Sequence, residues 1–166
     1  MRISEILTPS FRALRDLTQI SQKSQKSIVE LCRSNDSDFC REVVARGWLT
    51  EEQMAHAAER YRLGRSRSGR CIFWMIDETG RVYDGHIGNS WVSAMLKARE
   101  PELLKDWHTE HCLLGLHQIK NEKIKELKNK TSVAVVESER SAVILSEVLP
   151  EYIWMASVYP MNLNVR

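Results

Sequence analysis

The sequence lacks several features that would assign it to a class at once. It has no apolar run near the roughly 18 residues of a membrane-spanning helix, and residues 1–16 carry acids and arginines where a secretory leader would be apolar. Seven glycines and four prolines among 166 residues exclude collagen-like and low-complexity classes. We therefore expect a globular chain of the cytoplasm with no membrane partner.

Metal-binding and catalytic signatures are also scarce. The four cysteines form no CxxC pair, and their spacing does not suit a zinc knuckle. The nearest approach to a ligand cluster runs from His108 to Cys112, which a polar helix end explains better than a metal, so we expect buried thiols and no zinc. The sequence contains no glycine-rich phosphate loop, nucleophile elbow or HExxH motif.

The charge is nearly balanced, with 24 basic and 22 acidic residues, so only its distribution can indicate a nucleic-acid partner. Arginines crowd residues 60–70, where Glu59 is the nearest acid, and the serines and glycines between them are typical of a loop. Guanidinium groups on such a loop can each donate two parallel hydrogen bonds to a phosphate. A solubilising surface with ion pairs is an equal alternative. The first interpretation predicts these nucleic-acid contacts: Arg62, Arg65, Arg67 and Arg70.

Helical spacing of apolar residues predicts three helices in the first third of the chain. They cover residues 27–33, 38–45 and 51–61. Residues 34–37 interrupt the pattern and supply N-cap chemistry for the second helix. Residues 50–53 have the sequence of a capping box and open the third.

The middle of the chain predicts a β-hairpin. Residues 71–76 are apolar throughout, residues 77–80 have turn composition, and residues 81–87 return with the alternation of a strand. Residues 91–96 are expected to form a short helix or an irregular cover. Residues 102–107 are expected to form a turn of helix, and residues 118–130 a charged amphipathic helix.

The last third predicts a β-α-β unit with a right-handed crossover. Residues 131–136 have the apolar character of a central parallel strand. A helix then runs to Leu149, stopped by Pro150, and residues 152–157 form the second strand. The apolar face of the helix is expected to consist of Ile144, Leu145, Val148 and Leu149.

Together these elements predict a mixed fold of the α+β or α/β class. It comprises an N-terminal helical region over residues 1–63, a hairpin and helical region over 64–130, and a partial β-α-β sheet over 131–166.

Glu137 directly follows the first strand of the β-α-β unit. Parallel sheets hold ligands outside the carboxyl ends of their strands, and a carboxylate there suits Mg²⁺. With Ser138 and Glu139 it also matches a helix cap that complements the helix dipole. Spacing alone favours the cap.

Residues 133–142 resemble the opening motif of the Toprim fold of primases and topoisomerases, in which a hydrophobic strand ends in a glutamate. The hairpin over residues 69–82 resembles the segment that precedes Toprim in bacterial primases. With Leu113–His117 between them, their order is similar to primase-like proteins of Bacteroides-type mobile elements, over about residues 40–157.

The resemblance implies a role in DNA replication, with single-stranded DNA or RNA as partner. It also implies Mg²⁺-dependent phosphoryl transfer with Glu137 as ligand or general base. Ser138 replaces the usual glycine, however, and the second metal motif, Asp-x-Asp on a later strand, has no room after Ser157. The Asp-x-Asp at residues 36–38 lies in a helix cap. We therefore expect a shortened Toprim-like domain without independent catalysis.

A non-catalytic interaction protein is the alternative. An incomplete sheet leaves a strand edge that another chain can extend. Residues 153–157 are expected to carry that edge, and either a second copy or a partner protein would dock there.

Overall fold

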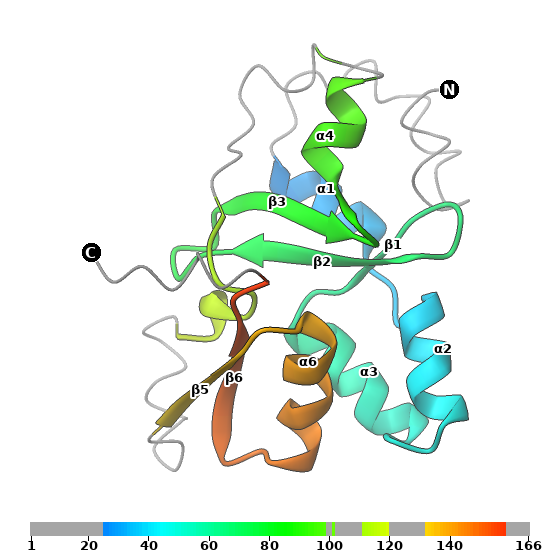
Figure 1. The fold of residues 1–166 in the computed structure, drawn as a ribbon, viewed down its shortest axis with the longest axis vertical. Coiled ribbons are helices and arrows are strands. Elements are labelled where there is room, and N and C mark those ends of the chain that lie inside the picture. The colour runs from blue at the N-terminus through cyan, green and yellow to red at the C-terminus, as the bar shows by residue number, and fades with distance from the viewer. Residues whose placement is uncertain (1–24, 99–100, 102–110, 120–131, 159–166) are drawn as a thin grey trace.

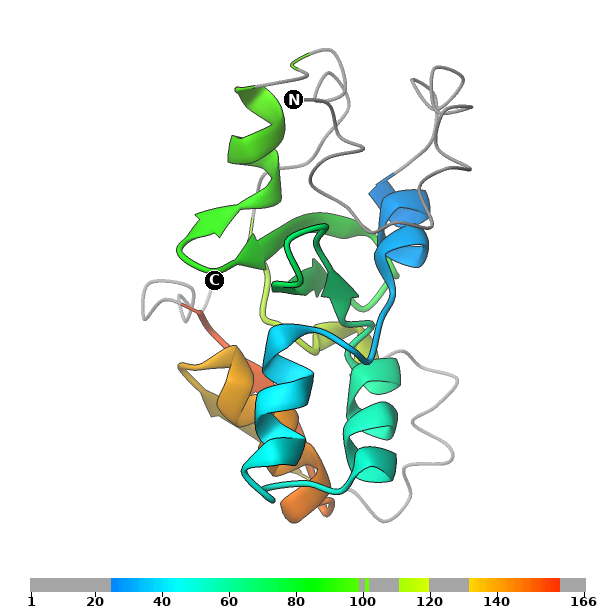
Figure 2. The same cartoon turned by 90° about the vertical axis from the view of Figure 1, so that its right-hand side faces the viewer.

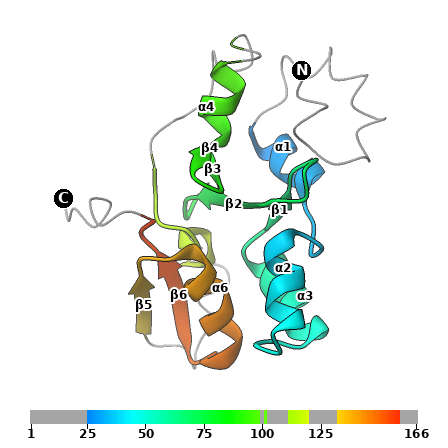
Figure 3. The same ribbon diagram turned by 45° about the vertical axis from the view of Figure 1, so that its right-hand side comes forward.

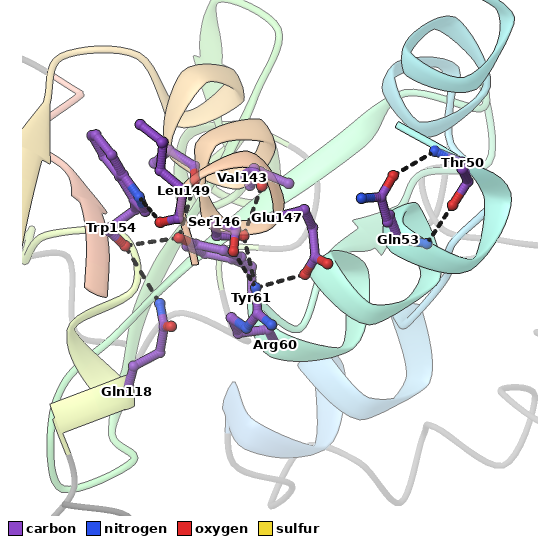
Figure 4. Close-up of polar contacts among 11 residues, drawn as sticks. Thr50, Gln53, Arg60, Tyr61, Gln118, Val143, Ser146, Glu147, Leu149 and Trp154 are labelled. Atoms are coloured by element: carbon purple, nitrogen blue, oxygen red, sulfur yellow. Dashed lines mark hydrogen bonds and ion pairs between the residues drawn. The ribbon is translucent and has the colours of Figure 1, made fainter. Parts of the chain in front are cut away.

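The computed structural model describes residues 25–98, 101, 111–119 and 132–158. It has the mixed α and β fold that the sequence predicts (Figure 1). Ser37 caps the second helix, since its Oγ accepts from the Cys40 backbone N–H at 3.3 Å. Thr50 and Gln53 close the reciprocal capping box that opens the third helix (Figure 4). The first three helices are α1 (Gln25–Cys32), α2 (Asp38–Ala45) and α3 (Glu51–Arg60).

An antiparallel sheet lies at the centre of the fold, with its strands in chain order. The predicted hairpin forms its middle pair, and two short strands flank it. The strands are β1 (Gly64–Arg65), β2 (Cys71–Ile76), β3 (Val82–Ile87) and β4 (Ser90–Trp91), and α4 (Val92–Lys97) follows the last of them.

Strand β2 is apolar throughout because both of its faces are buried. Ile72, Trp74 and Ile76 pack on one face with residues of α1 and α4. The alternate residues of β2 pack on the other face with residues of α2 and α3. Figure 1 shows this layering, with α1 and α4 on one side of the hairpin and α2, α3 and α6 on the other.

Gly85 makes room for the buried side chain of Trp74. It lies opposite Trp74 in the β2–β3 register. A Cβ atom built on Gly85 would lie 2.8 Å from Trp74 ring atoms and from Ile72 Cγ2. Only a residue without a side chain allows this packing.

The hairpin turn is organised by Asp77. Its Oδ1 accepts hydrogen bonds from the Thr79 and Arg81 backbone N–H groups, both at 2.9 Å, and from the Thr79 hydroxyl at 2.6 Å. Burial raises the pKa of the Asp77 carboxyl, but these hydrogen bonds outweigh it and leave the pKa lowered.

A parallel β-α-β unit forms the second sheet. It consists of β5 (Ser132–Val136), α6 (Glu139–Val148) and β6 (Tyr152–Ala156). On the other edge of β6, Leu114 and Ala156 exchange two backbone hydrogen bonds of 2.9 and 3.1 Å. The 3₁₀ helix η4 (Leu116–Ile119) follows directly. Figure 3 shows α6 between the strands of this unit and the α2–α3 pair.

The expected burial of the β-α-β strands was wrong. Val133 and Val135 in β5 are 48% and 42% exposed, so β5 is not a central strand. Ile153 and Met155 in β6, by contrast, are buried. The reason is that β6 lies between β5 and Leu114, whereas β6 is the one neighbour that β5 has among the described strands.

The expected apolar face of α6 was wrong for two of its four residues, since Ile144 and Leu145 are half-buried but Val148 and Leu149 are not. Its buried residues are Ala142, Val143 and Ser146, whereas Val148 and Leu149 are exposed. The small side chains let α6 approach α3, and the ring of Tyr61 fills the space between them.

Two expected helices, over residues 102–107 and 118–130, lie wholly or largely outside the described residues. Among the helices that are described, none combines the length and apolar character that crossing a membrane requires.

Candidate nucleic-acid interface

Arg60, the first arginine of the 60–70 cluster, links helices α3 and α6. Its Nη1 donates to the Ser146 carbonyl at 3.1 Å, to the Ser146 hydroxyl at 2.9 Å and to Glu147 at 2.6 Å (Figure 4). Because these groups belong to α6, the Arg60 guanidinium forms part of the contact between α3 and α6. Arg60 is therefore a structural residue.

The connection between β1 and β2 holds three of the remaining arginines in a defined turn. The Ser66 hydroxyl accepts from the Arg70 N–H at 3.0 Å, and Gly69, with φ of +86°, donates to the Ser66 carbonyl. The turn also docks on the start of α2, where the Asp38 N–H donates to the Gly69 carbonyl at 2.8 Å. Its serines and glycines thus fix the backbone that carries Arg65, Arg67 and Arg70.

Arg41 of helix α2 lies close to these arginines. The sequence did not indicate this proximity. The Arg41 Nη2 lies 3.6 Å from the position of a Cβ on Gly69, and Arg65 Nη2 lies 4.0 Å from the same point. Arg41 contacts Asp36 Oδ1 at 3.1 Å, and Arg65 lies 4.0 Å from Asp36 Oδ2. Two guanidinium groups therefore share one carboxylate.

The other predicted arginines are Arg62, Arg67 and Arg70. Arg67 and Arg70 are exposed, and Arg70 reaches towards Gly88 in the β3–β4 turn. Arg62 is half-buried and lies 3.9 Å from Glu30. We call these five residues the arginine surface: Arg41, Arg62, Arg65, Arg67 and Arg70.

Arg33 lies next to the arginine surface but is paired with acids. Its guanidinium donates to Glu30 at 3.2 Å and to Glu59. The hydrogen bond to Glu59 is the main reason that the pKa of Arg33 is raised. Its charge is thus offset, and its planar group is held between two carboxylates.

Glu137 is exposed at the end of β5, and its carbonyl accepts from the Val158 N–H at 3.0 Å. The nearby Glu139 instead contacts His86 Nδ1 of β3. Among the described residues, no three histidine, cysteine or acidic side chains gather to hold a metal ion. Glu137 alone does not fit an Mg²⁺ site, which needs several oxygen ligands.

The aromatic residues near the loop belong to the fold. Trp91 stacks on His111 with ring centroids 3.8 Å apart, and its ring centroid lies 4.9 Å from that of His86. The buried Asp84 caps α4 from β3, because its Oδ1 accepts from the Ser93 N–H at 3.0 Å. Burial raises the pKa of Asp84, and the hydrogen bonds from Ser93 oppose that rise.

The cysteines are free thiols, as expected. Cys32, Cys40 and Cys71 are buried and Cys112 is half-buried. Burial raises the pKa of Cys32 and of Cys112 to about 12, so neither provides a thiolate nucleophile near neutral pH.

A family model described as Domain of unknown function (DUF6371) matches residues 38–166. The matched region includes α2, α3, the β1–β2 turn and both sheets. No curated protein and no solved structure matches the chain.

Proposed function

Because the chain belongs to the DUF6371 family, whose description names no activity, we propose a function from its arginine surface. The protein is a nucleic-acid-binding protein of primase-like, mobile-element origin, acts in DNA replication in the cytoplasm, and lacks catalysis of its own. The observation that carries this proposal is the docking of the β1–β2 turn on α2, which brings Arg65 and Arg41 to one carboxylate beside the exposed Arg67 and Arg70.

Arg41 and Arg65 have one carboxylate between them. Asp36, the carboxylate that Arg41 and Arg65 share, is itself 61% exposed at its side chain. Within the described residues, the buried Nε of Arg65 has no hydrogen-bond partner. A phosphate oxygen would supply an acceptor for the Arg65 Nε, and guanidinium groups bind phosphates through paired hydrogen bonds.

We propose that the protein lacks catalysis because the acidic side chains of its described residues do not assemble the metal site that the Toprim resemblance implies. Glu137, the residue that the Toprim resemblance implies as ligand, stands exposed, and Glu139 contacts His86. The parallel β5–α6–β6 unit supports the resemblance in its topology. A second metal motif is not found on the strand that follows α6.

The experiment that tests binding is a fluorescence anisotropy titration of a labelled single-stranded DNA at several salt concentrations. Affinity is expected to fall steeply with salt, and Arg67→Ala and Arg70→Ala should each flatten the log–log slope by roughly 0.7 for a lost phosphate contact. Arg46→Ala is the matched control, because Arg46 pairs with Glu42 at the far end of α2. Salt-independent binding, or an equal loss in the control, would refute the proposal.

The exposed valines of β5 favour a second candidate, a non-catalytic protein that docks on a second copy of itself. Parallel strands are normally buried on both faces, yet Val133 and Val135 are about half exposed. Light scattering after size exclusion tests it. The parent should be a dimer that Val135→Lys converts to a folded monomer, and a monomeric parent at tens of micromolar rules this candidate out.

A further inference from the structure

A shallow pocket of about 210 Å³ lies beside the arginine surface, between α3 and the segment that joins α1 to α2. Figure 2 shows this segment passing the end of α3 on its way to α2. Alanines and a leucine contribute apolar lining, and polar side chains complete the wall. The lining residues are Arg33, Ser34, Asn35, Ala55, Ala58, Glu59 and Leu63.

The pocket and the arginine surface are continuous along the chain. Asn35 lines the pocket, and the next residue, Asp36, is the carboxylate that Arg41 and Arg65 share. On the neighbouring segment, Leu63 lies next to Arg62, and its carbonyl accepts from the Ser34 N–H at 3.0 Å. A ligand whose phosphates lie on the arginines therefore reaches the pocket with its adjoining groups.

Resting on the proposed function, we infer that this pocket receives one unpaired base, so that the ligand is single-stranded nucleic acid. Ala55 and Ala58 are three residues apart on one face of α3 and leave room for a flat ring. The Arg33 guanidinium, fixed by Glu30 and Glu59, presents a plane on which a base stacks. Asn35 provides an amide for the edge of the base.

The size and charge of the pocket agree with a base better than with a phosphate. Drug-sized ligands occupy pockets of about 300–1,000 Å³, so a pocket of about 210 Å³ suits a smaller group. The two charged groups of its lining, Arg33 and Glu59, are paired with each other, so the pocket offers no free cation for a phosphate. The phosphates therefore lie on the arginines, and the neutral base enters the pocket.

Only an unpaired base can enter. In a duplex, each base is stacked and paired, and only its groove edges are accessible, whereas single strands splay their bases into protein pockets. The pocket thus converts a surface that binds any phosphate backbone into one that prefers single strands.

The test is an anisotropy titration of the full chain with three labelled probes of equal length: a single strand, its duplex, and a strand of abasic sites. Ala55→Leu fills the pocket without changing charge or helix propensity appreciably. It should weaken single-strand binding by about 5- to 100-fold, with no change in duplex or abasic affinity or in the salt slope. Ala94→Leu on the exposed face of α4 is the matched control.

The outcomes distinguish a failure of the pocket inference from a failure of the proposed function. If Arg70→Ala weakens binding to all three probes but Ala55→Leu binds the single strand like the parent, the pocket inference is wrong and the proposed function stands. Equal parent affinity for the single strand and the abasic strand also overturns the inference alone. A parent that binds no probe overturns both.

A second variant is needed in case Ala55→Leu does not fold. Asn35→Ala changes a linker residue rather than a helix, and it should lower single-strand affinity with an unchanged thermal unfolding midpoint. If Ala55→Leu fails to fold, Asn35→Ala decides: parent-like single-strand affinity overturns the inference.

Discussion

Removing the Tyr61 hydroxyl should weaken the contact between α3 and the β-α-β unit. Tyr61 is fully buried, and its hydroxyl donates to the Trp154 carbonyl at 2.7 Å and lies 3.2 Å from the Ala142 carbonyl (Figure 4). Burial raises the pKa of Tyr61, so the hydroxyl remains a donor at neutral pH. Tyr61→Phe keeps the ring and its packing and removes only this donor.

The magnitude follows from the groups left behind. Removing one partner of a buried hydrogen bond costs about 1–3 kcal/mol, because the remaining group stays buried without its partner. The Trp154 carbonyl keeps a long hydrogen bond from Gln118, at 3.4 Å, which favours the lower part of this range. We expect a loss of about 1–2 kcal/mol in the free energy of unfolding, or roughly 2–8 °C in the unfolding midpoint.

Urea unfolding followed by circular dichroism at pH 7 measures this loss. Tyr152→Phe is the control, because Tyr152 is 37% exposed and removing its hydroxyl should change stability by less than about 0.5 kcal/mol. The reasoning is refuted if Tyr61→Phe unfolds within about 0.5 kcal/mol of the parent, or if the control loses as much.

Two further predictions concern the central sheet. Gly85→Ala should lower the free energy of unfolding by about 1–3 kcal/mol, because its Cβ would meet the Trp74 ring at 2.8 Å; urea unfolding with an unchanged midpoint would contradict this. Asp77→Asn should destabilise the protein at pH 7 but much less at low pH. The folded-state pKa of Asp77 is lowered from 3.8, so its contribution is present above about pH 4 and is lost as the pH falls through the folded-state pKa. Unfolding at pH 7, 5 and 3 checks this, and a difference from the parent that stays constant with pH would show the carboxylate to be unimportant.

The sequence predicted those elements whose signals are local. Helix α2 and the capping box of α3 follow from neighbouring residues, and the apolar run of β2 identifies a buried strand. The run does not say which elements cover the strand. That is why Val133 and Val135 resembled a central strand, although they lie at the exposed side of the second sheet.

The candidate site likewise contains residues that local sequence predicts and residues that only the three-dimensional structure brings together. The density of arginines between residues 60 and 70 predicted the contacts of Arg62, Arg65, Arg67 and Arg70, because this signal lies within a few residues. Arg41 joins them only through the docking of the loop on α2, and the pocket around Asn35 exists only where the α1–α2 segment meets α3. Contacts between separate elements leave no periodic pattern for a sequence to show.

The contact between α3 and the β-α-β unit also has a consequence for synthesis of the chain. The Tyr61 hydroxyl bonds a carbonyl that lies 93 residues later, whereas the β2–β3 hairpin pairs residues close in sequence. At about 5–20 residues per second, the ribosome needs roughly 5–20 s to supply the later partner. During that interval the ring of Tyr61 lacks its cover, so the nascent helices present an apolar surface to chaperones until β6 emerges.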